Sequence, residues 1–206
     1  MPPGSTVKMV FDYFYSIQPC LGQRVSGDAA VVEYTERWVF MAIIDALGHG
    51  AKAHQVSRLA KDYLEKYWSQ DVCQTLQQLH HHLKGSLGAA VGLGAMDLAT
   101  ARFAYTGIGN TTIRILRRRD GESNSPRLYS AEGIVGSYIP HPVEQTAILD
   151  SADLILMYSD GVQEDFSLQN YPSIFTDDVM TISRKIVRKY GKNYDDATCI
   201  ALKFQM

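Results

Sequence analysis

Four aspartates in short segments rich in small residues are the side chains of this sequence that most clearly indicate chemistry. They lie in the segments Ser26-Gly27-Asp28, Asp45-Ala46-Leu47-Gly48-His49-Gly50, Ser159-Asp160-Gly161 and Tyr194-Asp195-Asp196-Ala197-Thr198. At least three of them adjoin an apolar run that is typical of a strand. Strand ends from distant parts of a chain can converge, and converging carboxylates repel one another unless a cation lies between them. The residues therefore favour an all-oxygen site for Mg²⁺ or Mn²⁺.

The segment after Asp45 adds further candidates for such a site. Two glycines allow close backbone approach, and the helix expected to follow directs its N-terminal dipole to the same place, which favours anions. The backbone carbonyl of Ala46 is a candidate ligand, and His49 is a candidate general acid or a residue that supports the ligands. Taken alone, each aspartate also fits an ordinary turn or helix cap. One shared metal site accounts for all four.

The expected chemistry is hydrolysis of a phosphate ester. Two ions bridged by Asp28 and Asp45, or by a water, would produce a hydroxide nucleophile near neutral pH and hold a phosphoryl oxygen. The sequence offers no obvious serine or cysteine nucleophile, because it contains neither a GxSxG segment nor a Cys-x5-Arg loop. The adjacent histidines at 80–82 point in different directions on a helix, so we expect a solvated face there rather than a metal site.

Composition narrows the class of protein. With 206 residues, 46% of them hydrophobic and 20% charged, the chain is expected to form one domain over residues 1–206. The net charge of −2 gives no strong field for nucleic acid or a membrane surface. Three cysteines without a CxxC pair argue against disulfides and zinc and favour a reducing compartment. The sequence shows neither a signal-peptide pattern nor a membrane-spanning apolar run, so we expect a cytoplasmic protein.

Hydrophobic periodicity predicts strands first, then two helices, more strands, a helix and a final strand. This order favours antiparallel sheets covered by helices, an α+β layered domain. The expected strands are 7–15, 29–34, 38–44, 89–97, 102–107, 111–117, 127–130, 143–149, 154–158 and 197–204, and the expected helices are 51–68, 72–83 and 176–190.

Five short motifs, in order along the chain, resemble those of the metal-dependent serine/threonine protein phosphatases of type 2C. The likeness extends from about residue 7 to residue 204 and is greatest to the compact bacterial branch that contains sporulation and stress-response phosphatases, including stressosome phosphatases. The motifs are Ser26-Gly27-Asp28, Asp45-x-x-Gly48-His49-Gly50, Gly107-x-Gly109-Asn110, Tyr158-Ser159-Asp160-Gly161-Val162 and Asp195-Asp196-Ala197-Thr198.

The resemblance implies a four-layer α-β-β-α sandwich, with two central antiparallel sheets flanked by helices. It implies two divalent cations, Mn²⁺ or Mg²⁺, at one edge of the sandwich. By position, Asp28 and Asp45 would be bridging or shared ligands, and the Ala46 carbonyl would bind one ion. Asp160 and Asp195 would bind the other ion.

The resemblance also implies a reaction and a partner. Metal-bound hydroxide would attack the phosphorus of phosphoserine or phosphothreonine, with His49 as the proton donor to the leaving oxygen. The branch acts on STAS-domain scaffold proteins of the stressosome, so the implied partner is a phosphorylated protein, with no nucleic acid and no membrane, and a monomer is expected. Residues 163–175 are short where larger relatives carry an inserted flap. We therefore expect an open site that suits a folded protein.

Two positions depart from the family, and two alternative functions stay open. Asn110 stands where many relatives have an aspartate that helps to hold a third ion, which puts a third site in doubt. Arg24 lies near the place of the arginine that grips phosphate in eukaryotic relatives and is a candidate phosphate ligand. The alternatives are a catalytically silent module that binds phosphoproteins and a phosphoesterase for small molecules. The complete aspartate set disfavours the silent module.

Overall fold

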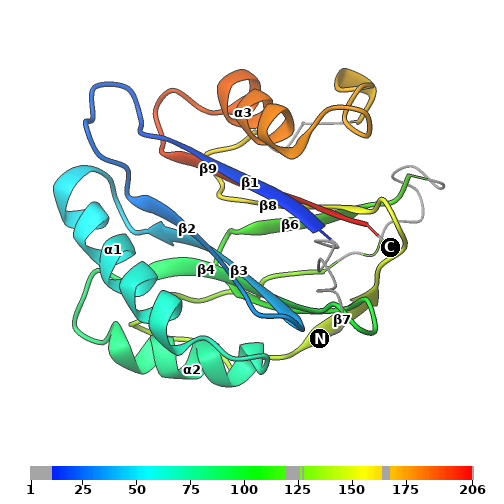
Figure 1. The fold of residues 1–206 in the computed structure, drawn as a ribbon. Helices are drawn as coiled ribbons and strands as arrows, with labels where there is room; N and C mark the ends of the chain where they lie inside the picture. The colour runs from blue at the N-terminus through cyan, green and yellow to red at the C-terminus, as the bar shows by residue number, and fades with distance from the viewer. Residues whose placement is uncertain (1–10, 119–125, 127, 164–167, 206) are drawn as a thin grey trace, which may run out of the picture.

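Two antiparallel sheets face each other in the computed structural model, which describes residues 11–118, 126, 128–163 and 168–205 (Figure 1). The strand orders are β1-β9-β8-β6 in the four-stranded sheet and β2-β3-β4-β5-β7 in the five-stranded sheet. The strands are β1 (Phe11–Gln18), β2 (Asp28–Tyr34), β3 (Trp38–Ala46), β4 (Ala89–Asp97), β5 (Arg102–Ile108), β6 (Thr112–Leu116), β7 (Gln145–Ile148), β8 (Leu154–Tyr158) and β9 (Ala197–Phe204). The helices are α1 (Gly50–Tyr67), α2 (Val72–His82), α3 (Val179–Tyr190) and a short 3-10 helix, Leu168–Asn170.

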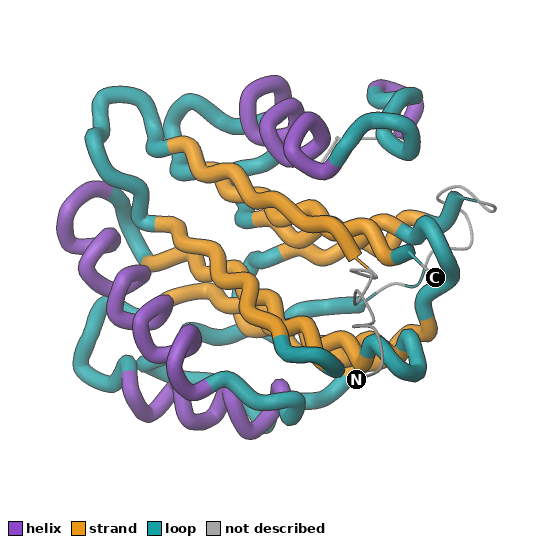
Figure 2. The backbone as a smooth tube through the Cα atoms, viewed as in Figure 1, coloured by secondary structure: helices purple, strands orange, loops and turns teal. Residues whose placement is uncertain are grey.

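Helices cover the outer face of each sheet. Helix α3 lies over the four-stranded sheet, and α1 and α2 lie over the five-stranded sheet (Figures 1 and 2). The arrangement is a four-layer α-β-β-α sandwich, so the fold class expected from the sequence is confirmed.

Three layers of buried apolar side chains hold the sandwich together. Because neighbouring residues of a strand face opposite ways, Phe40 packs beneath α1 and α2 while Met41 packs between the sheets. Strand β4 is buried at every position, since both its faces and both its edges are covered. The third layer lies under α3 and contains Leu156, Ile182 and Ile186.

The structure corrects two of the expected elements. The helix expected from residue 176 begins at Val179, because the Asp178 side chain accepts a hydrogen bond from the Thr181 N–H at 2.8 Å and caps the helix there. No strand forms over 128–130, the described part of the expected strand at 127–130. The N–H and carbonyl of Tyr129 pair instead with the side-chain amide of Gln145. Residues 7–10 of the first expected strand lie outside the described residues.

Candidate metal site

Asp28 and Asp45 lie directly opposite each other on adjacent strands. Asp28 begins β2, Asp45 is the penultimate residue of β3, and the antiparallel register pairs them. Side chains of such a pair share one face of the sheet. Ala30 lies two residues after Asp28, and Ile43 lies two residues before Asp45. Both pack between the two sheets. By the alternation of the strands, both carboxylates also point between the sheets.

Ser159 connects this pair to the other sheet. It follows β8, is fully buried, and donates a hydrogen bond from Oγ to Asp28 Oδ2 at 2.6 Å. The N–H of Thr198 on β9 donates to the same Ser159 Oγ at 3.0 Å, which fixes the hydroxyl. The other oxygen, Asp28 Oδ1, is buried and has no hydrogen-bond partner among the described residues. Asp28 therefore has one oxygen held by the protein and one available to a ligand.

Asp160 enters the site on the turn that follows β8. Asn110 donates from Nδ2 to Asp160 Oδ2 at 2.5 Å, and the Lys192 ammonium donates to the Asp160 backbone carbonyl at 2.6 Å. An amide at position 110 thus orients Asp160, whereas the aspartate of many relatives would add a negative charge there.

Asp195 and Asp196 have different surroundings, although they are neighbours in the sequence. Asp196 is buried, and its two oxygens accept hydrogen bonds from the N–H groups of Cys20 at 2.9 Å and Gly27 at 2.7 Å. Asp195 is partly buried and accepts a hydrogen bond from the Asp196 N–H at 2.9 Å. Asp196 therefore fastens the loop that leads to Asp28, and Asp195 is the member of the pair with room to bind a ligand.

Gly161 allows two of these loops to pack together. A Cβ atom at this position would collide with the backbone carbonyl of Asp196. The turn after β8 therefore lies directly against the loop before β9. This close approach brings the segments that carry Asp160 and Asp195 side by side.

Burial and mutual repulsion disfavour the charged forms of these carboxyls. Burial is the main cause that raises the pKa of Asp28. Burial first, and then the charges of Asp28, Asp160 and Asp195, raise the pKa of Asp45. The pKa of Asp195 is raised by burial and next by Asp160. Because the charged forms of Asp28, Asp45 and Asp195 are disfavoured, a positive charge placed among these carboxyls would stabilise them.

These residues fit a divalent cation. Within the described residues, no three or more His, Cys, Asp or Glu side chains lie close enough together to hold a metal ion as they stand. The aspartates nevertheless act on one another's pKa, supply only oxygen, and include the unpartnered buried Oδ1 of Asp28. Oxygen donors of this kind suit Mg²⁺ and Mn²⁺. Binding would have to draw the carboxylates closer together.

The remaining predicted site residues, Ala46, His49 and Arg24, differ in their position and exposure. Ala46 is buried at the end of β3, and its N–H donates to the Gly27 carbonyl at 3.2 Å. His49 precedes α1 and is exposed, with no side-chain bond that caps the helix. Arg24 is exposed in the loop before β2. In the described part of the chain, neither His49 nor Arg24 is hydrogen-bonded to the four aspartates, so their roles stay predictions.

Sequence reasoning missed several residues that support the site. His54 on α1 pairs through Nδ1 with the Ser26 carbonyl at 2.9 Å, just before the first motif. Ser159 stands beside Asp160 in the sequence, but nothing there shows that it bonds to Asp28. Lys192 likewise gives no local signal of its bond to Asp160. These roles come from contacts between residues that are far apart in the chain.

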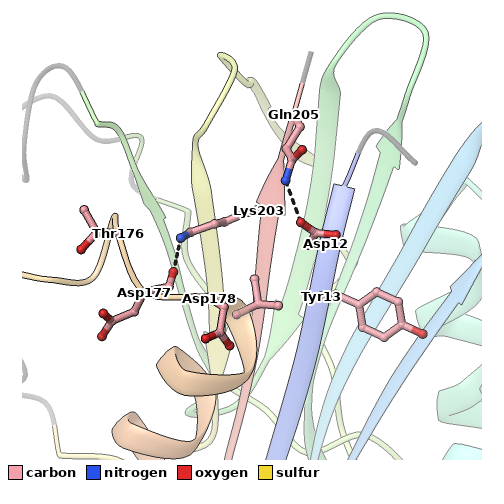
Figure 3. A pocket seen from close by; sticks show the side chains of 8 residues that line it. Asp12, Tyr13, Thr176, Asp177, Asp178, Lys203 and Gln205 are labelled. Carbon is pink, nitrogen blue, oxygen red and sulfur yellow. Dashed lines mark hydrogen bonds between the residues drawn. The ribbon is translucent and has the colours of Figure 1, made fainter. Parts of the chain in front are cut away.

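A recess of about 400 Å³ at the start of α3 is separate from the aspartates (Figure 3). Lys203, near the end of β9, donates there to the Phe175 and Asp177 carbonyls, and Gln205 donates to Asp12 at 2.6 Å. Because β9 begins beside Asp196, the two places are separated by the length of that strand, about 25 Å at 3.3 Å per residue. The side chains of Lys203, Gln205 and Asp12 therefore already have hydrogen-bond partners within the protein.

Comparisons with known proteins identify relatives of this chain. Residues 35–205 match the model of the family described as stage II sporulation protein E (SpoIIE). The phosphoserine phosphatase RsbX of Bacillus subtilis (strain 168) is 27% identical over 143 residues, which are 68% of this chain and 69% of RsbX.

Two solved structures share the fold over nearly the whole chain. One, described as the bacterial stressosome, a modular system adapted to control secondary messenger signalling, has a TM-score of 0.86 at 25% identity. The match covers 94% of this chain and 99% of that one. The structure of RsbX in complex with magnesium has a TM-score of 0.81 at 20% identity, over 96% of this chain and 97% of RsbX. Among the described residues, no helix is long and apolar enough to cross a membrane.

A divalent cation should stabilise the protein, and Asp45→Asn should remove that effect. Mn²⁺ at about 100 times its Kd contributes about 2.7 kcal/mol if it binds only the folded state, which raises Tm by roughly 5–10 °C for a domain of this size. Burial and the neighbouring aspartates raise the pKa of Asp45 to about 9, so folding without metal has to protonate this carboxyl; Asp45→Asn removes that cost, and the metal-free variant should melt higher than the metal-free wild type. Differential scanning calorimetry with EDTA and then Mn²⁺ measures both effects.

Asp62→Asn is the matched control for that experiment, because Asp62 is an exposed residue of α1 whose nearest cation, Arg58, is 4.0 Å away. It should keep the full Mn²⁺ shift. A full shift in Asp45→Asn as well would contradict the assignment of Asp45.

Ser159→Ala should weaken both the fold and cation binding. Losing a hydrogen bond to a buried charged group costs roughly 1.5–3 kcal/mol of unfolding free energy, and Asp28 would lose the donor that orients it. Urea unfolding and calorimetric titration with Mn²⁺ measure the two effects. Ser183→Ala is the control, since Ser183 is also fully buried and donates to the Cys199 carbonyl at 2.8 Å, away from the aspartates. It should lower stability alone; equal Mn²⁺ affinities in the two variants would refute the role of Ser159.

Proposed function

The chain belongs to the stage II sporulation protein E (SpoIIE) family, and on that premise we propose that it is a metal-dependent protein phosphatase. Its substrates are phosphoserine and phosphothreonine on a regulatory protein. The observation that carries this proposal is the pairing of Asp28 with Asp45 on adjacent strands, with one buried oxygen of Asp28 left unpartnered among the described residues. The 27% sequence identity to the phosphoserine phosphatase RsbX, over 68% of this chain, supports the same reaction.

Asp28 and Asp45 would share two divalent cations, Mn²⁺ or Mg²⁺, with Asp160, Asp195 and the Ala46 carbonyl as further ligands. When bound, such cations supply an activated water and neutralise charge on the phosphoryl oxygens. The protein holds the ligands in place for this chemistry. Ser159 holds Asp28, Asn110 holds Asp160, and Asp196 holds the loop before Asp28. Fixed ligands of this kind spare the reaction the cost of reorganisation.

The protein also has to supply a proton to the leaving serine or threonine oxygen. We assign this role to His49, which is exposed at the start of α1 and can turn toward a bound substrate without breaking a hydrogen bond among the described residues. A histidine suits the task because its ordinary pKa lies near neutral pH. Arg24, exposed on the neighbouring loop, is the proposed contact for the phosphate.

For the partner we propose STAS-domain scaffold proteins of a stressosome. The support is the likeness, at 25% identity, to a chain from a structure described as the bacterial stressosome. We further propose a cytoplasmic location, which agrees with three cysteines that are all free thiols.

Hydrolysis of p-nitrophenyl phosphate tests the proposed metal chemistry. Activity should vanish with EDTA and return with Mn²⁺ or Mg²⁺. Asp45→Ala and Asp160→Ala should each lower kcat/KM at least about 100-fold, because even residues behind the ligands of a metal site are worth about 10–100-fold. Asp62→Asn, on the outer face of α1, should have the wild-type rate. Near-normal rates in both alanine variants would refute the ligand assignment.

The role of His49 is tested by comparing two leaving groups. Nitrophenolate leaves without a proton, whereas a serine alkoxide needs one. His49→Ala should therefore reduce kcat on a phosphoserine peptide by about 100-fold or more and change kcat on p-nitrophenyl phosphate little. His81→Ala, on the distant helix α2, should change neither rate. An equal loss on both substrates would count against proton donation by His49.

A further inference from the structure

The two most exposed large apolar side chains among the described residues are neighbours beside the aspartates. Leu21 is 85% exposed and Tyr194 is 79% exposed. The Leu21 N–H donates to the Asn193 carbonyl at 2.8 Å, which places the two loops side by side. Asp195 follows Tyr194 directly, and Cys20, the residue before Leu21, donates from its N–H to Asp196. Covering these exposed leucine and tyrosine side chains with another apolar surface would be favourable, because it would remove their apolar area from water.

A second exposed apolar pair adjoins Asp45. Leu47, two residues after Asp45, is 44% exposed, and Leu87 is 49% exposed. The Leu47 N–H donates to the Gly88 carbonyl at 3.0 Å, so these two loops also lie together. One apolar pair thus stands next to Asp195 and the other next to Asp45. Gly27 connects the two places, because its N–H donates to Asp196 Oδ2 at 2.7 Å and its carbonyl accepts from the Ala46 N–H at 3.2 Å.

Four separate loops carry these side chains, and all four gather at one end of the sandwich (Figure 1). They are the loops from β1 to β2, from β3 to α1, from α2 to β4 and from α3 to β9. Figure 2 shows the same gathering of loops beyond the strand ends. We call Leu21, Tyr194, Leu47 and Leu87 the apolar rim. Single exposed apolar residues are ordinary, whereas pairs that border a polar site indicate contact with another molecule.

We propose that the apolar rim binds apolar side chains that flank the phosphorylated residue of the protein substrate. The proposal rests on the proposed function and adds the class of sequence that the enzyme prefers. Because one pair adjoins Asp195 and the other adjoins Asp45, substrate residues next to a phosphoserine whose phosphoryl group reaches the aspartates come within reach of the rim. Contacts that exclude water from leucine and tyrosine side chains lower the free energy of the complex, and tyrosine is among the residues enriched at the centres of protein interfaces.

Two synthetic phosphoserine peptides of equal length test the proposal. One carries leucine at two positions on each side of the phosphoserine, and the other carries serine at those positions. The wild-type protein with Mn²⁺ should hydrolyse the leucine peptide with a kcat/KM about tenfold higher, equivalent to about 1.4 kcal/mol. The double variants Leu21→Ser/Tyr194→Ser and Leu47→Ser/Leu87→Ser should each bring this ratio toward one.

Hydrolysis of p-nitrophenyl phosphate, which has no flanking residues, should stay at the wild-type rate in both double variants and shows that they are folded. Ile148→Ser is the matched control, because Ile148 is 58% exposed on the edge strand β7, at the opposite end of the sandwich. It should keep the tenfold preference.

Three results would overturn the proposal. Equal rates on the two peptides in the wild type would do so, and so would a preference that both double variants retain. The third is a preference that Ile148→Ser loses to the same extent. In each case hydrolysis of p-nitrophenyl phosphate would persist, so the proposed phosphatase activity would stand. Failure of the wild type to hydrolyse either peptide or p-nitrophenyl phosphate with Mn²⁺ would remove the proposed function and the rim proposal together.

Discussion

The hydrogen bond from Ser159 to Asp28 joins the two sheets beside the strand pair that carries Asp28 and Asp45. Asp28 belongs to the five-stranded sheet and Ser159 to the end of a strand in the other sheet, so the bond crosses the interior of the sandwich. A buried carboxylate needs such a donor. With one oxygen satisfied in this way, the other is left for a ligand, and the repulsion from Asp45 favours a cation as that ligand. Both the fold and the proposed chemistry depend on this contact.

The loops around the site are fixed by the same kind of long-range contact. Asp196 fastens the loop before β2, and Gly161 lets the turn after β8 pack against the loop before β9. Lys192 and Asn110 hold the backbone and the side chain of Asp160. Asp160 and Asp195 thus stand on loops, yet each loop is tied to a strand end, whereas Asp28 and Asp45 belong to strands. A site built in this way combines a rigid scaffold with surroundings that can vary in sequence, and the apolar rim belongs to those surroundings.

Three strands were predicted from the sequence with the same first and last residues that the structure shows. They are β4 (89–97), β8 (154–158) and β9 (197–204), and each is an apolar run ended by turn residues. The hairpin was predicted, but the register that pairs Asp28 with Asp45 comes from the structure, in which Tyr34 lies opposite Val39. What local sequence could not supply is the division of roles between Asp195 and Asp196, since it depends on N–H groups some 170 residues earlier in the chain. The expected strand at 127–130 is wrong for a related reason, because a distant glutamine side chain satisfies the Tyr129 backbone.

Anomalous diffraction at the manganese absorption edge, from crystals of the protein grown with Mn²⁺, would locate divalent cations among the aspartates between the sheets. If these residues form the proposed metal site, we expect two anomalous peaks within bonding distance of the Asp28, Asp45, Asp160 and Asp195 oxygens, one of them next to Asp28 Oδ1. Crystals with ordered Mn²⁺ elsewhere on the molecule and no peak among these carboxylates would contradict it.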